Sequence, residues 1–409
     1  MVITLFDLGI GGHHSVYIKH LVSYWKTNVT EGDVLHIVVV PDFLAKHSEV
    51  VDLSLNVKNI NFVPISDEDN SKISSIHSSI VRSFVEWGFF CKYTHMLKTD
   101  HAYLLYFDHL QLPIILGNKP SSLFSGIYFR PTFHYHKFEN YKPSFKDKFR
   151  AWRQKILLLA VLRNSKLEKL FCLDPFVVPL VNQWLIRPKA IHLADPVEVT
   201  SIEASDILKL RIDLGIKSDR KIFLIFGLLS GRKGIYQVLE ALQNLPSEIT
   251  RQITLLLVGK IADTESVKIT SMVEKVKITS HVQIVTQYEF VSDQDVHKYF
   301  QLADVVLAIY QKHVGMSGIL LQAAAANKPV ISSDYGLMGQ IAKTYNRGLI
   351  IDGSQVQNIE DSIANILNVM SNKINDLQNP ESINIINQFT PNNFAETLIN
   401  HNRPSGERS

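Results

Sequence analysis

The sequence predicts an α/β protein built from two doubly wound Rossmann-like domains that face a cleft. Apolar strands alternate with amphipathic helices in two successive series, and alternation of this kind forms parallel sheets covered by helices on both faces. The 409 residues also exceed what one ordinary hydrophobic core holds. We expect an N-terminal domain over residues 1–198, a C-terminal domain over 199–382, and a closing helix with a tail over 383–409.

The first series opens with an apolar run ending in glycine, residues 2–9, before helical spacing in residues 14–25. Further strands are expected at 33–40, 57–65, 101–108, 122–130, 169–174 and 189–199. Helices are expected around 76–87, near Pro113 and within the basic segment 141–170. The connection between the domains is expected near Ala194 to Ser205.

The second series contains six apolar runs, each followed by a loop or helix. These predicted strands are residues 219–229, 252–260, 281–290, 303–310, 328–334 and 347–352. Thr390 before Pro391 is a typical helix cap followed by proline at the first helical position. We expect this closing helix to pack back toward the N-terminal domain.

The composition indicates a folded globular chain rather than a disordered one, since 46% of the residues are hydrophobic and 20% are charged. The formal charge of +3 is close to balance and gives no overall field for nucleic acid. Cys91 and Cys172 lie in no metal or redox spacing, which favours a reducing, cytoplasmic location. The first residues lack the basic region of a signal peptide.

Ligands of open α/β sheets bind beyond the carboxyl ends of the strands, so the loops there are the candidate sites. After the first strand, Gly11 and Gly12 leave backbone amides at a helix N-terminus for an anion or a sugar hydroxyl. His14 stands where a dinucleotide fingerprint needs its third glycine, which counts against a nicotinamide or flavin site. A glycine turn of purely structural use is the alternative.

A basic turn follows the first strand of the second series. Gly231, Arg232 and Lys233 precede an amphipathic helix, and the two cations suit the oxygens of a diphosphate. The alternative is a solvated basic turn, which this order of strand, glycine, cation and helix makes less favoured.

A small-residue loop lies further along. The backbone amides of Ser317, Gly318 and Ile319 open a helix that can receive a phosphate, and Gln322 follows one turn inside. A plain structural helix is the alternative.

Histidines follow two neighbouring strands of the first series. His134 and His136 alternate with aromatic residues, and Asp108 with His109 forms a similar pair. Each can bond a sugar or move a proton, although a histidine in such a place is more often structural. Tyr288 gives a weaker signal for a ring that contacts a base. No set of metal ligands is expected.

The motifs FGLLSGRKG, LLLVG, YFQLADVVLAIY and GMSGILLQAAAANKPVISSDYGLMGQI, with RGLIID after them, resemble the retaining glycosyltransferases of family 4, which have the GT-B fold. The resemblance covers residues 221–363, and it implies that the C-terminal domain binds the nucleotide sugar and that the N-terminal domain lies on the acceptor side. The N-terminal half resembles the family more loosely, through GIGGHH and the histidines at strand ends.

The resemblance implies transfer of a sugar from a nucleotide diphosphate sugar to an acceptor hydroxyl, with retention and without an obligatory metal or cofactor. It implies that Arg232 and Lys233 bind the diphosphate, that Gly12 lies near phosphate and sugar, and that the amides of Ser317 to Ile319 bind phosphate. Two glutamates of the family correspond here to Val314 and Gln322. Gln322 keeps a hydrogen-bonding group for the ribose, and His134 is the nearest candidate for a catalytic side chain.

Three functions follow as hypotheses. The first is a glycosyltransferase that builds a glycan, a glycolipid or a glycosylated metabolite. The second is an inactive GT-B-like protein that binds a nucleotide sugar or a partner, because both family glutamates are replaced. The third is a nucleotide-sugar epimerase, which is disfavoured because the loops show no persuasive set of carboxylates.

The basic segment 141–170 carries nine Lys or Arg residues against Asp147 and Glu168, together with Phe149 and Trp152. This pattern is typical of a peripheral contact with an anionic lipid surface, at the inner face of a membrane. An ordinary domain helix is the alternative, and the broad apolar run LLLAVL favours it.

Overall fold

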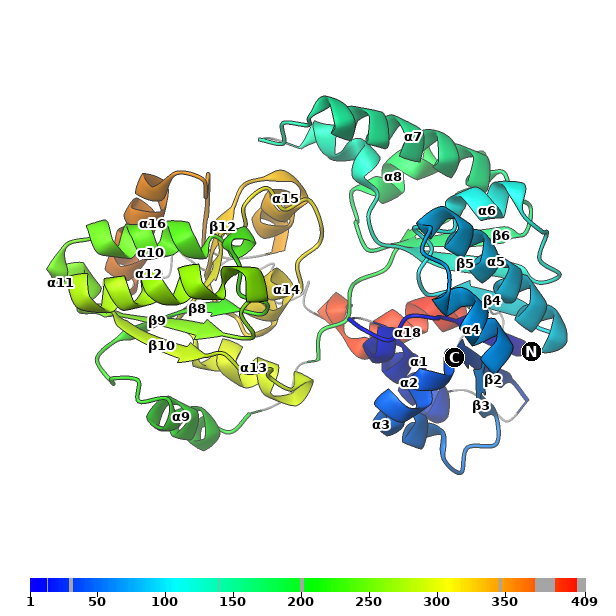
Figure 1. Ribbon diagram of the computed structural model, residues 1–409, viewed down its shortest axis with the longest axis horizontal. Helices are drawn as coiled ribbons and strands as arrows, with labels where there is room; N and C mark the ends of the chain where they lie inside the picture. Colours follow the sequence, from blue (N-terminus) through cyan, green and yellow to red (C-terminus); the bar gives the residue numbers. More distant parts are fainter. Residues whose placement is uncertain are drawn as a thin grey trace. The chain divides into compact units, whose positions relative to one another are not determined.

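The computed structural model describes residues 1–12, 14–28, 32–138, 140–198, 202–345, 348–371 and 387–402. The chain forms two compact units (Figure 1). Unit 1 comprises Met1–His134, Pro143–Pro196 and Pro391–Ser409, and unit 2 comprises Tyr135–Lys142 and Val197–Thr390. The predicted division differs in three respects: residues 135–142 cluster with unit 2, unit 2 resumes at Val197 rather than at residue 199, and Pro391–Ser409 belong to unit 1. The boundary predicted between 382 and 383 lies outside the described residues.

Unit 1 is built on a seven-stranded sheet in the order β3-β2-β1-β4-β5-β6-β7, and every neighbouring pair is parallel. Its strands are β1 (Val2–Phe6), β2 (Val34–Val39), β3 (Ile60–Pro64), β4 (His101–Leu104), β5 (Leu123–Tyr128), β6 (Leu167–Cys172) and β7 (Ala190–His192). Its helices are α1 (His14–Asn28), α2 (Pro41–Lys46), α3 (Ser48–Val51), α4 (Asp67–Ser74), α5 (Ser79–Met96), α6 (Gln111–Leu116), α7 (Phe145–Leu162), α8 (Val177–Asn182) and α18 (Pro391–Ile399).

Unit 2 is built on a six-stranded parallel sheet in the order β10-β9-β8-β11-β12-β13. Its strands are β8 (Lys221–Phe226), β9 (Ile253–Val258), β10 (Gln283–Gln287), β11 (Val305–Ala308), β12 (Val330–Ser333) and β13 (Gly348–Ile351). Its helices are α9 (Ala204–Asp213), α10 (Ile235–Asn244), α11 (Ser247–Thr250), α12 (Ser266–Thr279), α13 (Asp293–Leu302), α14 (Gly318–Ala325), α15 (Gly336–Tyr345) and α16 (Val356–Ser371).

Both sheets place their strands in the Rossmann order, so the predicted fold class is confirmed. The central strands are apolar on both faces because helices cover each sheet from two sides, as Figure 1 shows for each unit. The predicted helix around 76–87 begins later and runs further, as α5, since the Ser78 side chain accepts a hydrogen bond from the Val81 amide and sets its start. Among the described residues no helix is both long and apolar enough to cross a membrane.

The predicted closing helix, α18, packs on unit 1. It begins at Pro391, and its Phe394, Leu398 and Ile399 side chains are buried in the unit 1 core. The Phe394 ring lies 4.6 Å from the ring of Tyr17, centroid to centroid. The Tyr103 hydroxyl donates to the Leu398 carbonyl at 2.6 Å. The core of unit 1 is therefore completed by a segment that follows all of unit 2 in the chain.

Candidate functional site

The strand order gives each sheet one switch point, where consecutive crossover connections run in opposite directions. In unit 1 it lies between β1 and β4, and in unit 2 between β8 and β11. Ligands of this fold bind beyond the carboxyl ends of the strands at that point. The candidate ligand-binding loops are thus those after β1 and β4 in unit 1 and those after β8 and β11 in unit 2.

The basic turn after β8 is shaped by two glycines with left-handed backbone. A Cβ on Gly234, at φ +75°, would lie 2.1 Å from the Ile309 carbonyl oxygen, so only glycine allows this approach to the end of β11. Gly227 has φ +97°, and a Cβ there would lie 3.1 Å from Nζ of Lys233. These glycines allow the turn to bring Lys233 back against the end of its own strand.

Lys233 is 6% exposed. Its ammonium donates to the Phe226 carbonyl and, at 2.8 Å, to the Tyr310 hydroxyl. Burial lowers the pKa of Lys233 and the nearby Arg232 adds to the decrease, whereas Tyr310 opposes it. Among the described residues no carboxylate forms an ion pair with Arg232 or Lys233, so this buried cation lacks a counter-charge.

Arg232 lies beside Lys233 and is exposed. Its guanidinium lies 5.3 Å from the centroid of the Tyr310 ring, and its Nη1 is 3.2 Å from Nδ1 of His313. The Ser317 hydroxyl donates to the Tyr310 hydroxyl at 3.3 Å. Arg232, Lys233, Tyr310, His313 and Ser317 form one group, which we call the Tyr310 cluster.

The structure thus brings together residues predicted from two separate loops, Arg232 and Lys233 from one and Ser317 from the other. Tyr310 and His313 were not predicted as site residues. The available signal was position alone, because Tyr310 ends the predicted strand 303–310 and His313 begins the small-residue loop. Helix α14 begins at Gly318, directly after the cluster, and the Ser317 side chain makes no capping bond there. The backbone of Gly318 and Ile319 therefore begins the helix next to the two cations.

Gln322 has a different environment. Its carbonyl oxygen is buried, and its side chain contacts His297 of α13. Burial lowers the pKa of His297, and the contact with Gln322 opposes this decrease. Among the described residues Gln322 makes no hydrogen bond to the Tyr310 cluster.

The amide of Gly231 is already engaged. It donates to Oε2 of Glu265 at 2.5 Å, and the same oxygen accepts from the Tyr236 hydroxyl at 2.6 Å. These hydrogen bonds lower the pKa of Glu265. Glu265 was not predicted, and a ligand that uses the Gly231 amide has to displace it.

Tyr288 is half-buried and packs against the unit 2 core after β10. The residues that follow it, Phe290 and Val291, line a cavity of about 540 Å³ between α9 and α13. Charged side chains on both helices, Lys209, Asp213, Asp295 and Lys298 among them, make this cavity polar. The structure does not bring Tyr288 into the Tyr310 cluster among the described contacts.

In unit 1, the loop after β1 holds a histidine against a buried carboxylate. Nδ1 of His14 lies 2.7 Å from both oxygens of Asp7, and the Gly9 amide donates to Asp7 at 2.8 Å. A Cβ on Gly9 would lie 2.4 Å from the His14 ring, so glycine is needed for this packing. The hydrogen bond to Asp7 raises the pKa of His14, and burial partly opposes it.

The same loop holds the two predicted glycines. Gly12 has φ +70°, a conformation that favours glycine, and a Cβ at Gly11 or Gly12 would meet no described atom within 4 Å. The space beside these two glycines is therefore open among the described residues, and the approach of a phosphate or sugar to them stays a prediction.

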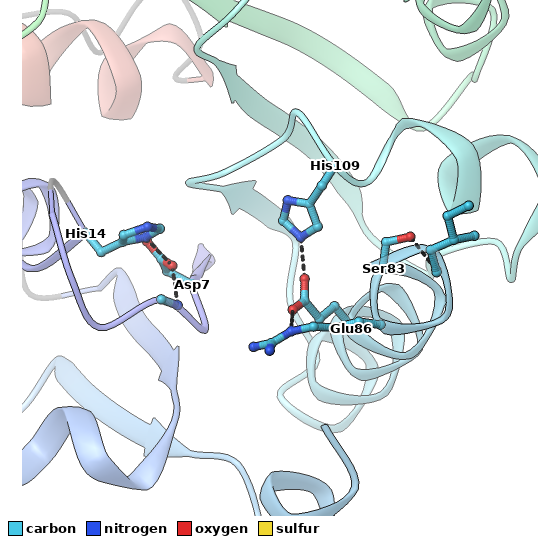
Figure 2. Close-up of polar contacts among 8 residues, drawn as sticks. Asp7, His14, Ser83, Glu86 and His109 are labelled. Carbon is cyan, nitrogen blue, oxygen red and sulfur yellow. Dashed lines mark hydrogen bonds and ion pairs between the residues drawn. The ribbon is translucent and has the colours of Figure 1, made fainter. Parts of the chain in front are cut away.

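The loop after β4 presents His109. Its Nε2 bonds to Oε2 of Glu86 on α5, and Oε1 of Glu86 accepts from Nε of Arg82 at 2.9 Å. Burial acts to raise the pKa of Glu86, but His109 and Arg82 outweigh it, so the pKa lies below the ordinary value. Figure 2 shows the Asp7–His14 pair and the His109–Glu86 pair as two separate groups.

Asp7, His14, Arg82, Glu86 and His109 line one cavity of about 150 Å³, with Tyr106 beside them. We call it the two-histidine cavity. It lies at the switch point of the unit 1 sheet and offers donors and acceptors for hydroxyl groups. Asp108 takes no part, because its carboxylate accepts from the amides of Phe129 and Arg130 and thereby joins two strand ends. Burial raises the pKa of Asp108 to about 6.

His134 does not reach the two-histidine cavity. It is 2% exposed, and its Nε2 bonds to Oδ2 of the buried Asp174 at 2.7 Å. His136, two residues on, is exposed. A buried pair of this kind is typical of a structural role, and a catalytic role for His134 stays a prediction. His14 and His109, by contrast, line the two-histidine cavity.

Comparisons with known proteins bear on both units. Residues 206–378 match the family described as glycosyl transferases group 1. A stretch of 120 residues is 31% identical to lipopolysaccharide glucosyltransferase WaaG of Escherichia coli (strain K12), covering 29% of this chain and 29% of that protein. The match thus spans under a third of the curated relative.

Solved structures resemble almost the whole chain. The Anabaena protein HepE, solved with UDP and glucose, has a TM-score of 0.65 at 14% identity, with 98% of this chain and 99% of that chain covered. A glycosyltransferase from Rickettsia africae has a TM-score of 0.68 at 13% identity, covering 100% and 99%. WaaG itself has a TM-score of 0.57 at 14% identity, covering 98% and 100%. The chain therefore shares the two-domain GT-B fold of these solved structures, and its residues 206–378 match the glycosyl transferases group 1 family.

Proposed function

We propose that this protein is a retaining glycosyltransferase of family 4, which moves a sugar from a nucleotide diphosphate sugar to an acceptor hydroxyl without a metal or cofactor. The observation that carries the proposal is the Tyr310 cluster. It holds two cations next to a helix N-terminus at the switch point of unit 2, and neither cation has a carboxylate partner among the described residues. A diphosphate supplies the counter-charge that this arrangement lacks.

The two cations act on the leaving group. As the bond between the anomeric carbon and the phosphate oxygen breaks, negative charge grows on the diphosphate. The ammonium of Lys233 is fixed in advance by Phe226 and Tyr310, so it can stabilise that charge without first reorganising. Arg232 can add paired donors to the same oxygens.

Retention requires the acceptor to arrive on the face that the diphosphate leaves. The acceptor oxygen forms a bond to the anomeric carbon, and its proton passes to the oxygen of the departing phosphate on that face. Such a reaction needs no carboxylate base, so Val314 and Gln322 at the positions of the family glutamates are compatible with it.

Similar proteins support a nucleotide-sugar donor. HepE has been solved with UDP and with UDP-glucose, and WaaG is named a lipopolysaccharide glucosyltransferase. We propose a UDP-sugar as the first donor to test and a glycan or glycolipid as the acceptor class, with a small metabolite as the alternative. We assign the acceptor's hydroxyl groups to the two-histidine cavity of unit 1.

A second candidate is a binding protein without turnover. The observation that favours it is the loss of both carboxylates, at Val314 and Gln322, together with the side chain of Gln322 contacting His297. Such a protein keeps the Tyr310 cluster and binds nucleoside diphosphates, but it transfers no sugar.

One experiment separates the candidates. Release of nucleoside diphosphate from a panel of nucleotide sugars, with glycan and glycolipid acceptors present, is measured for the wild type, for Arg232→Ala with Lys233→Ala, and for a control, Lys275→Ala with Lys277→Ala on the exposed side of α12. A transferase loses turnover by roughly a hundredfold or more in the cluster variant and keeps it in the control. Equal rates in all three proteins would reject the proposal, and nucleotide binding without any release favours the second candidate.

A further inference from the structure

Helix α7 carries a row of exposed apolar side chains. Phe145 is 86% exposed, Phe149 58%, Trp152 60% and Ile156 45%. The spacings of four, three and four residues place all of them within roughly 60° around the helix axis. We call these four residues the α7 stripe.

The stripe is not the face that holds the helix in unit 1. Leu158, Val161 and Leu162 are buried on the other side, where α7 packs against α6. The start of α7 is fixed separately by a capping box between Ser144 and Asp147. The helix is therefore anchored without the stripe, and Figure 1 shows it as a long helix above α8 in unit 1.

Cations border the stripe on both sides. At about 100° per residue, Lys146 and Arg153 fall on one flank, and Lys148 and Lys155 on the other. With Arg150, α7 carries five cations and one carboxylate. That carboxylate, Asp147, accepts from the Ser144 hydroxyl at 2.6 Å and forms an ion pair with Arg150 at 3.7 Å, so five cations and one carboxylate leave α7 with a net charge of +4.

We propose that the α7 stripe with its bordering cations docks on an anionic lipid surface. Aromatic side chains in the middle of the face suit the boundary between headgroups and acyl chains, and the flanking Lys and Arg side chains suit anionic headgroups. A second copy of the chain fits less well, because it would bring two faces of equal positive charge together. This inference does not depend on the proposed function.

The test uses the full chain and two kinds of vesicle, one of phosphatidylcholine and one of equal parts phosphatidylcholine and phosphatidylglycerol. The wild type is expected to sediment with the anionic vesicles, to stay in solution with the neutral ones, and to be released as salt rises. The variant Lys146→Gln, Lys148→Gln, Arg153→Gln is expected to lower the partition coefficient roughly a hundredfold, since each cation near such a surface contributes comparably. Phe149→Ser with Trp152→Ser is expected to lower it at least tenfold.

Matched controls separate this face from general stickiness. Val267 and Ile278 on α12 in unit 2 are 86% and 84% exposed, so Val267→Ser with Ile278→Ser removes a similar exposed apolar area and is expected to leave partition unchanged. Circular dichroism verifies that each variant is folded. Absence of binding to anionic vesicles, or binding that only the α12 variant weakens, overturns the proposal. A second outcome also overturns it: the wild type does not bind vesicles and is a dimer in light scattering, and Phe149→Ser with Trp152→Ser makes it monomeric.

Discussion

Replacing Lys233 by methionine should weaken nucleotide binding strongly while leaving the fold intact. Methionine matches much of the length of lysine and carries no charge. The change removes a buried cation whose pKa burial already lowers, so it also relieves the cost of desolvating that charge. It leaves the Phe226 carbonyl and the Tyr310 hydroxyl without the donor they share. These two effects on stability oppose each other, and we expect little net change in the melting temperature of the free protein.

The effect on nucleotide binding is larger, because no second effect offsets the lost hydrogen bond to the ligand. A hydrogen bond to a charged group contributes about 1.5–3 kcal/mol, so losing it weakens binding by roughly 10- to 150-fold. A ligand at about 100 times its Kd stabilises the native state by about 2.7 kcal/mol. If the Kd rises roughly a hundredfold, the same ligand concentration stabilises the variant by only about 0.4 kcal/mol.

Chemical denaturation with and without UDP measures both numbers. Lys328→Met is the matched control, because burial also lowers the pKa of Lys328, which lies in unit 2 outside the Tyr310 cluster. The control should keep the full stabilisation by UDP. Undiminished stabilisation of Lys233→Met by UDP would refute the assignment of the diphosphate to this turn.

Three further predictions concern unit 1. Gly9→Ala places a Cβ 2.4 Å from the His14 ring, so the His14 side chain should move away from Asp7. The KM for the acceptor should then rise, while donor binding measured by calorimetry stays unchanged. An unchanged KM contradicts the acceptor assignment. His134→Ala leaves the buried Asp174 without its histidine partner, although the Phe176 amide still donates to Oδ1, and should lower the free energy of unfolding by about 3–5 kcal/mol. The specific activity of the folded fraction should be preserved, and a selective loss of kcat would support a catalytic role for His134. The pKa of His14 is raised in the folded state, so the Asp7–His14 pair stabilises the protein fully below the ordinary histidine pKa and loses this contribution as the pH rises through the raised value. The unfolding free energy of the wild type minus that of Asp7→Asn should therefore be largest in mild acid, and a difference that grows with pH would oppose the reasoning.

The positions of the strands and of the basic turn could be predicted because they depend on local signals. An apolar run followed by glycine and two cations is visible within a dozen residues, and parallel sheets place all such loops at one edge. Ser317 is far in sequence from Arg232 and Lys233, but both loops follow strands of one parallel sheet, which predicts that the three residues share a site.

The partners of these residues could not be predicted in the same way. Glu86 lies on α5 and meets His109 from the loop after β4, a contact fixed by how the helix packs on the sheet and not by spacing. Glu265 reaches Gly231 across a comparable separation. For His134 the residue was predicted but its environment could not be. A histidine among aromatic residues does not indicate whether its side chain faces a cavity or a buried aspartate.

Because α18 completes the core of unit 1, it affects the order in which the two units can fold during synthesis. During synthesis the residues up to Pro196 leave the ribosome without Phe394, Leu398 and Ile399, which fill part of their core. Unit 2 emerges in full before those side chains arrive. The core of unit 1 can therefore be completed only after the last helix is translated. A truncation before Pro391 should leave an exposed apolar groove in unit 1, to which chaperones bind and at which proteases cleave.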